Sequence, residues 1–288
     1  MNRKIAIILS HPIQYYSPFF AALNDEGFVF KVFYTLGDSD GIDAGFGKQI
    51  MWDLPLLQHY DYEFLSNMSS EPGSNHYNGI ISPDLISTVE RYNPEVILIY
   101  GWAYAAHLKA MKYFHSKVPI WFKGDSTLLD DLPYWKKITR KIALTYVYRH
   151  IDKAFYVGSN NYDYFRSFGL KNNQLIFAPH AIDNQRFAED KFIHAEKIKK
   201  KLNISPDDII VLFAGKFQAK KNPEILLKAF KSMKLDNVHL LMVGNGILEE
   251  KLKYKSQQLG LKSQKIHFMD FQNQSQMPAV YQACDIYC

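Results

Sequence analysis

Residues 211–230 read VLFAGKFQAKKNPEILLKAF, a pattern that predicts a strand, a loop and the start of a helix. The apolar start is typical of a buried strand, which Gly215 ends. In the Asn-Pro-Glu at 222–224, the asparagine is suited to cap the helix and the proline to its first position. The free N–H groups of a helix start attract anions, and Lys216 and Lys221 precede them. We interpret the turn as a cradle for a diphosphate; the alternative is an ordinary solvated loop rich in lysine.

The composition limits the class of protein. With 288 residues, 47% of them hydrophobic, the chain suits one large or two ordinary domains. No apolar run approaches the roughly 20 residues of a membrane span, and the first residues are unlike a signal peptide. Cys284 and Cys288 form neither a disulfide framework nor a zinc pattern. The net charge of +5 favours anionic ligands or an anionic membrane face, and is too small and scattered to indicate nucleic acid. We expect a cytoplasmic protein.

Strand-like and helix-like patterns alternate along the whole chain with short connections. This alternation predicts an α/β fold with doubly wound parallel sheets. A charged segment at 189–206 is typical of a linker helix. The sequence therefore predicts a first Rossmann-like domain over 1–188 and a second from 207 to 288. The predicted strands are 4–9, 28–35, 96–100, 119–122, 153–159, 174–179, 209–214, 238–243, 265–268 and 285–287.

The turn after residue 214 resembles a motif of family 4 (group 1) glycosyltransferases. In that motif a glycine is followed by a basic residue and, six positions after the glycine, by a lysine. Gly215, Lys216 and Lys221 occupy these places, although the family usually has arginine where this chain has Lys216. A lysine lacks the bidentate fork of arginine, so it would hold phosphate less tightly. The resemblance implies a GT-B fold, with these three residues at the diphosphate of a nucleotide sugar and with neither metal nor cofactor.

The loop after the first predicted strand, SHPIQYYSP at 10–18, resembles the start of a bacterial subgroup of the family. Parallel sheets bind ligands at the carboxyl ends of their strands. The resemblance therefore implies that His11, Gln14 and Tyr15 contact the acceptor; alternatively they cap and pack the first helix. A later loop of the family carries a histidine or aspartate near the donor sugar and the acceptor hydroxyl. Asp125 is the matching side chain here, and its alternative role is that of a turn residue.

The second domain carries a Gly-x-Gly after its second predicted strand, formed by Gly244 and Gly246. Glu249 stands where a dinucleotide fingerprint needs its third glycine, which argues against a Rossmann oxidoreductase. The resemblance implies that this loop faces the nucleotide and that Phe271 lies near the nucleobase.

A basic helix is predicted over 134–152. Trp135, Ile138 and Ile142 fall on one stripe of it, with lysines and arginines on the rest. Such a helix suits an anionic membrane surface. We interpret it instead as a core helix that packs by its apolar stripe and exposes a basic face.

Family members continue beyond the last predicted strand into a loop with two donor-binding glutamates. The resemblance therefore implies a truncated sequence with an incomplete second domain. For the whole protein it implies retaining transfer of a sugar from a nucleotide-diphosphate sugar to the hydroxyl of a saccharide or lipid-linked acceptor, in bacterial cell-surface polysaccharide or glycolipid synthesis. The alternative is a nucleotide-binding fragment or interaction protein without catalysis.

Overall fold

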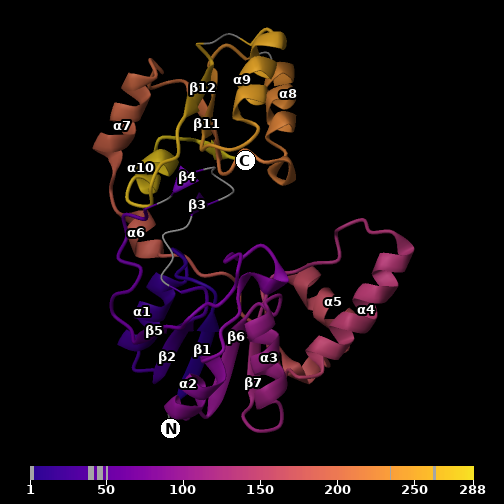
Figure 1. Ribbon diagram of the computed structural model, residues 1–288. Helices are drawn as coiled ribbons and strands as arrows, with labels where there is room; N and C mark the ends of the chain where they lie inside the picture. Colours follow the sequence, from indigo (N-terminus) through magenta and orange to yellow (C-terminus); the bar gives the residue numbers. More distant parts are fainter. Residues whose placement is uncertain (1–2, 38–41, 44–47, 50, 234, 262–263) are drawn as a thin grey trace. The chain divides into compact units, whose positions relative to one another are not determined.

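A computed structural model describes residues 3–37, 42–43, 48–49, 51–233, 235–261 and 264–288. The chain divides into two compact units (Figure 1). The first unit comprises Met1–Ser39 and Leu56–Ile182, and the second comprises Asp40–Pro55 and Asp183–Cys288. Each unit is built on its own parallel sheet. None of the helices in the described part of the chain is long and apolar enough to span a membrane.

The first unit contains a seven-stranded parallel sheet in the order β5-β2-β1-β6-β7-β8-β9. Helices cover both faces of the sheet, which explains why strands such as VILIY at 96–100 are apolar throughout. Ile8 and Ile97 face α2 and α3, whereas Ile7 and Leu9 pack with Phe20 of α1. The strands are β1 (Ile5–Leu9), β2 (Phe30–Tyr34), β5 (Tyr62–Phe64), β6 (Val96–Tyr100), β7 (Ile120–Lys123), β8 (Lys153–Tyr156) and β9 (Leu175–Phe177). The helices are α1 (Ser17–Asp25), α2 (Leu85–Tyr92), α3 (Ala105–Phe114), α4 (Tyr134–Tyr148) and α5 (Ser159–Ser167).

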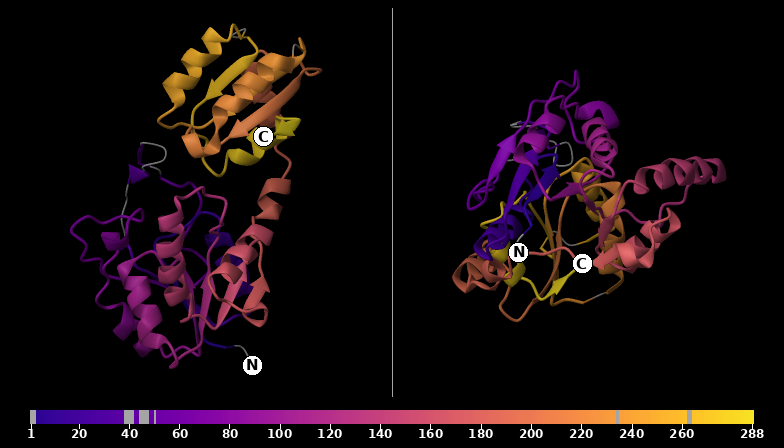
Figure 2. Two further views of the ribbon diagram at one scale, coloured as in Figure 1. Left: turned by 90° about the vertical axis from the view of Figure 1, so that its right-hand side faces the viewer. Right: turned by 90° about the horizontal axis from the view of Figure 1, so that it is seen from below.

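The second unit contains a four-stranded parallel sheet in the order β12-β11-β10-β13. Figure 2 shows helices on both faces of this sheet. α8 and α9 pack on the face of Val211 and Leu240, and α7 and α10 on the face of Leu212 and Leu241. The strands are β10 (Ile209–Ala214), β11 (Val238–Val243), β12 (Ile266–Met269) and β13 (Ile286–Tyr287). The helices are α6 (Asn184–Ala188), α7 (Phe192–Lys201), α8 (Pro223–Met233), α9 (Glu249–Gln258) and α10 (Met277–Gln282), and β3 (Ile42–Asp43) pairs with β4 (Lys48–Gln49).

The predicted doubly wound parallel architecture is confirmed for both sheets. In each sheet the first strand lies between neighbours that the chain reaches in opposite directions: β1 between β2 and β6, and β10 between β11 and β13. Ligands of open parallel sheets bind at such a switch point, outside the carboxyl ends of the strands. The loops after β1 and β10 are therefore the places where the fold favours binding.

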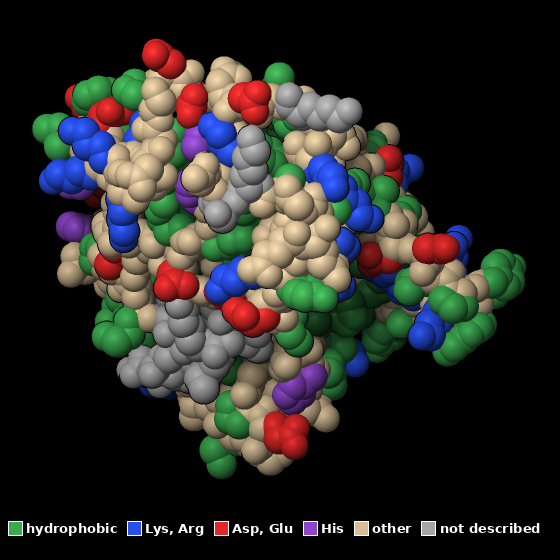
Figure 3. Space-filling view, turned by 90° about the horizontal axis from the view of Figure 1, so that it is seen from above, with side chains coloured by type: hydrophobic (Ala, Val, Ile, Leu, Met, Phe, Trp, Pro, Cys, Tyr) green, Lys and Arg blue, Asp and Glu red, His purple; other side chains and the backbone are tan. Residues whose placement is uncertain are grey.

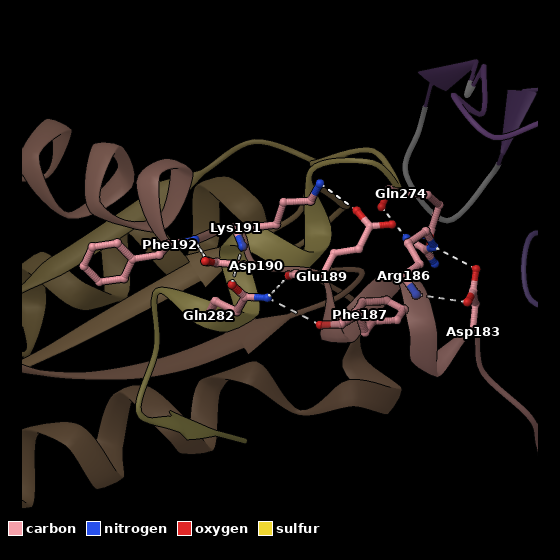
Figure 4. Close-up of polar contacts among 9 residues, drawn as sticks. All are labelled: Asp183, Arg186, Phe187, Glu189, Asp190, Lys191, Phe192, Gln274 and Gln282. Atoms are coloured by element: carbon pink, nitrogen blue, oxygen red, sulfur yellow. Dashed lines mark hydrogen bonds and ion pairs between the residues drawn. The ribbon is translucent and has the colours of Figure 1, made fainter.

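The segment predicted as a linker helix belongs to the second unit, where side chains of other segments hold it (Figure 4). The Gln282 side chain of α10 donates to the carbonyl of Glu189 at 2.7 Å and accepts from the N–H of Lys191 at 2.8 Å. Arg186 donates to the carbonyl of Gln274 at 2.5 Å. The observed division at residues 182/183 thus differs from the predicted end of the first domain at 188, because α10 satisfies the backbone polar groups of this segment.

The predicted packing of α4 is wrong. Trp135, Ile138 and Ile142 are 62%, 44% and 68% exposed, respectively. The helix packs instead by Leu144 and Val147 in its C-terminal half. Periodicity identifies which residues share a face of a helix, but it does not tell whether another element lies against that face.

Candidate functional site

The turn after β10 lies at the switch point of the second sheet. The Gly215 N–H donates to the carbonyl of Val243 at 2.9 Å, which extends the pairing of β10 with β11. A 3-10 turn at Ala219–Lys221 follows, with Lys221 exposed at its end. Asn222, the predicted N-cap, then adopts left-handed backbone (φ 48°) instead of the extended backbone usual for an N-cap. As predicted, α8 begins at the proline that follows, and the half-buried Lys216 lies beside the glycine.

The two glycines after β11 allow this loop to approach the loop after β10. Gly244 has φ +136°, and a Cβ there would lie 2.1 Å from the carbonyl oxygen of Gly215. Gly246 has φ +154°, and its Cβ would lie 2.7 Å from the carbonyl oxygen of Phe217. Close packing of backbone against backbone therefore accounts for both glycines.

Asn245, between these glycines, connects three loops. Its carbonyl oxygen accepts from the Phe217 N–H at 3.0 Å, and its side-chain oxygen accepts from the Phe271 N–H at 2.9 Å. Its side-chain NH₂ donates to Glu249 at 3.0 Å and to Asp270 at 2.9 Å. The bond to Asn245, together with Lys253, lowers the pKa of Glu249. The sequence analysis assigned no role to Asn245. The pattern that could have indicated one is an amide side chain between two glycines at the end of a strand.

A cavity of about 360 Å³ adjoins the same loops. Gly244 lines it together with Asp270 and Gln272 from the end of β12, while Glu249 and Lys253 line it from α9. Volumes of this size hold small ligands. The predicted nucleotide-side loop thus borders a cavity of the second unit.

A segment distant in sequence also binds the loop after β12. The carboxylate of Asp53 accepts from the backbone N–H of Ser275 at 3.1 and 3.2 Å and contacts its hydroxyl. Asn273 donates to the carbonyl of Met51 at 2.7 Å, and Trp52 lies edge-on to Phe271 at 5.9 Å. The backbone of the predicted nucleobase residue is therefore held by Asn245, and its ring is contacted by an indole.

The loop after β1 carries the predicted acceptor residues at the switch point of the first sheet. His11 Nδ1 is 2.9 Å from the hydroxyl of Ser10, and Gln14 is half-buried. Tyr15 is 41% exposed and lies edge-on to His180 at 6.1 Å. This places an aromatic surface with polar edges where a parallel sheet presents ligands.

Asp125 follows β7 and lies within electrostatic range of this loop. Burial raises the pKa of Tyr15, and the Asp125 charge raises it further. The same charge opposes the effect of burial on Lys123, whose pKa is nevertheless lowered. Lys123 is 9% exposed and donates to the carbonyl of Ala178 at 2.6 Å. Sequence reasoning missed this lysine, although a charged residue at the end of an apolar strand is a recognisable signal.

His107 connects the residues that follow β2 and β6. It is fully buried, with Nε2 2.8 Å from the hydroxyl of Thr35 and Nδ1 2.9 Å from the carbonyl of Gly101. Because a carbonyl only accepts, Nδ1 carries the proton and donates it to Gly101. Burial lowers the pKa of His107 to about 4. The imidazole is therefore neutral and structural.

The predicted site residues thus gather in two groups, one in each unit. Asp125 lies with the loop of His11, Gln14 and Tyr15 in the first unit. The second group consists of Gly215, Lys216, Lys221, Gly244, Gly246 and Phe271.

Residues 194–288 match the model of the family described as Glycosyl transferases group 1. Among solved structures, HepE of Anabaena, in complex with UDP and glucose, aligns with a TM-score of 0.68 at 15% identity, over 99% of this chain and 73% of that one. WaaG, a glycosyltransferase involved in lipopolysaccharide biosynthesis, aligns with a TM-score of 0.59 at 14% identity, over 98% and 74%.

A putative UDP-N-acetylglucosamine 2-epimerase from Listeria monocytogenes is also similar, with a TM-score of 0.64 at 14% identity, over 100% of this chain and 74% of that one. The comparison with curated proteins gave no match. The structural likenesses establish the fold, which these enzymes of different activity share. The chain thus has two Rossmann-like parallel sheets of the GT-B type, and its residues 194–288 match the group 1 glycosyltransferase family model.

Proposed function

We propose that the protein is a retaining glycosyltransferase that moves a sugar from a nucleotide-diphosphate sugar to an acceptor hydroxyl. In this reaction the bond between the anomeric carbon and the diphosphate oxygen breaks, and a bond to the acceptor oxygen forms. The acceptor hydroxyl loses its proton, and the diphosphate leaves with the negative charge. The observation that carries the proposal is the turn from Gly215 to Pro223, a basic turn at a switch point inside the segment that matches the family.

Charge stabilisation gives this turn its chemical role. Lys216 and Lys221 would meet the negative charge that develops on the leaving diphosphate, at the N-terminal end of α8 where the helix dipole also favours an anion. The φ angle of Gly215 lies outside the left-handed region. Among the described residues, a Cβ there would meet only the Phe213 ring, at 3.9 Å. Within the described residues, the fold therefore does not require a glycine at this position, which supports a close approach of the ligand to the backbone.

The nucleoside would lie on the side of Gly244, Gly246 and Phe271, next to the cavity of the second unit. In the first unit, Asp125 would orient the acceptor hydroxyl, and His11, Gln14 and Tyr15 would contact the acceptor. Sugar faces suit the exposed aromatic ring in this loop.

The acceptor that we propose is a saccharide or a lipid-linked saccharide of bacterial cell-surface polysaccharide or glycolipid synthesis. Anabaena HepE, crystallised with UDP and glucose, and WaaG, which acts in lipopolysaccharide biosynthesis, support this class of reaction. We place the enzyme in the cytoplasm, at the inner face of the membrane.

Calorimetric titration with nucleoside diphosphates and their sugars tests the donor site without requiring the acceptor. Lys221→Ala is expected to abolish measurable donor binding and to lower turnover by ~10²-fold, the usual effect of losing one charge-stabilising donor. Lys220→Ala is the matched control, because it removes the same charge from the adjacent exposed position. Equal losses in both variants, or no binding by the folded parent chain, would contradict the assignment.

Product analysis distinguishes the proposed glycosyltransferase from an epimerase and from a non-catalytic nucleotide-binding protein. Transfer to an added acceptor supports a glycosyltransferase, whereas a changed sugar configuration without transfer would indicate an epimerase. Donor binding with neither reaction would indicate a nucleotide-binding protein without catalysis.

A further inference from the structure

The N-terminal half of α4 and the loop before it carry a group of exposed apolar side chains. Figure 1 shows this part of the first unit standing away from its strands. We call the surface the α4 tip. Its most exposed apolar side chains are Leu129 at 73%, Tyr134 at 80%, Trp135 at 62% and Ile142 at 68%, with Ile138 at 44%.

Basic side chains accompany this apolar stripe. Four of them, Lys136, Lys137, Arg140 and Lys141, lie within two turns of Trp135, and α4 contains no acidic residue from Tyr134 to Tyr148. Asp131, in the preceding loop, contacts Lys137 at 3.6 Å. Figure 3 shows hydrophobic and basic side chains side by side on the projection at its right-hand edge. The surface thus combines a single sign of charge on the helix with exposed aromatic and aliphatic groups.

We propose that the α4 tip docks on an anionic lipid bilayer. This choice of partner rests on the proposed function, because a lipid-linked acceptor would be presented at such a surface. An interfacial helix has lysines or arginines on one face and Trp, Tyr or Ile on the other, as this one does. Trp and Tyr belong at the boundary between headgroups and acyl chains, and lysine stems reach from there to the phosphates. The exposed apolar area stands on a projecting helix end, a shape suited to insertion beneath headgroups.

The charged and apolar side chains contribute separately to binding. Each Lys or Arg near an anionic surface strengthens binding about fivefold, so Lys136→Gln/Lys137→Gln/Lys141→Gln should weaken it roughly 100-fold. Each large apolar side chain contributes roughly tenfold or more when it enters the bilayer, so Trp135→Gln/Ile142→Gln should weaken binding by a similar factor. Because these residues are exposed, both variants should fold like the parent.

Vesicle sedimentation tests the proposal. The parent should sediment with vesicles of phosphatidylglycerol and phosphatidylcholine, much less with phosphatidylcholine alone, and less as salt is raised. Two control variants lie on the second unit and match the changes in charge and exposure. Lys197→Gln/Lys228→Gln/Lys231→Gln removes three exposed lysines, and Phe192→Gln/Ile193→Gln replaces side chains that are 65% and 68% exposed. Both controls should bind vesicles as the parent does.

Brominated lipid gives a second readout, since it should quench the fluorescence of the parent more than that of Trp135→Phe. The proposal is overturned if the parent ignores anionic vesicles, or if tip and control variants lose binding equally. It is also overturned if the tip variants change only the sedimentation coefficient of the free protein, which would indicate a second copy as the partner. Vesicle binding and donor binding are measured independently, so vesicle binding without donor binding would refute the proposed function and leave the docking surface intact.

Discussion

Replacing Gly244 with alanine should severely destabilise the second unit. A new Cβ would lie 2.1 Å from the carbonyl oxygen of Gly215, whereas real Cβ contacts essentially never fall below 3.0 Å. The two loops would have to separate by about 1 Å, which a close-packed interior resists. The bond from the Gly215 N–H to the Val243 carbonyl, at 2.9 Å, would be lost as they do so.

The cost follows from these contacts. The backbone at φ +136° costs an alanine about 2 kcal/mol, the lost hydrogen bond about 1 kcal/mol, and the disturbed packing raises the loss to about 3 to 5 kcal/mol. Gly260→Ala is the matched control, since this glycine also has positive φ (+64°) but a Cβ there would meet no atom of the described residues within 4 Å. It should cost only about 1 to 2 kcal/mol.

Urea denaturation followed by circular dichroism would measure both variants, and hydrogen exchange in peptides of β10 and β11 would locate the loss. Equal stability of Gly244→Ala and Gly260→Ala would refute the argument, because the two differ in the backbone contact.

Three further predictions concern other parts of the chain. Gly215→Ala should retain the stability of the parent within about 1 kcal/mol in denaturation, yet lose donor binding in calorimetry; unchanged affinity would remove its assigned role. The free energy of unfolding should fall by up to about 3 kcal/mol as pH drops from 6.5 toward 4, because the unfolded chain protonates His107 before the folded one does; a pH titration of His107→Gln that keeps the same acid slope would contradict this. Asp53→Ala should cost about 1 kcal/mol and speed hydrogen exchange of the Ser275 amide, and unaltered exchange would show that the carboxylate does not hold this loop.

Much of the fold is predictable from the sequence because glycines and prolines stand next to the ends of the apolar runs. The strand at 96–100 follows a proline and precedes Gly101, and its observed bounds are the predicted ones. The same holds for 209–214, which Gly215 ends. Several elements were not predicted, among them α9 and β5. α9 buries only Leu252 and Ser256, so it lacks an apolar stripe, and β5 is a three-residue strand at the sheet edge.

The sites are predictable only as far as they depend on local chemistry. The basic turn after Gly215 is visible in one stretch of sequence. By contrast, the bonds of Asp53 to Ser275 join residues far apart in the chain, and no local pattern indicates such a contact. The face of α4 was mispredicted for the opposite reason, because an apolar stripe was taken as a sign of a packing partner, whereas Ile142 is 68% exposed.

The amide of Asn245 has a thermodynamic consequence for ligand binding. It joins the loops of β10, β11 and β12, so a ligand group that orders one loop lowers the conformational entropy still to be lost by the other two. The nucleoside and diphosphate ends of a donor would contact different loops, so each end strengthens the binding of the other by the same factor. An intact nucleoside diphosphate should therefore bind more tightly than its separate halves predict, and Asn245→Ala should remove that cooperativity.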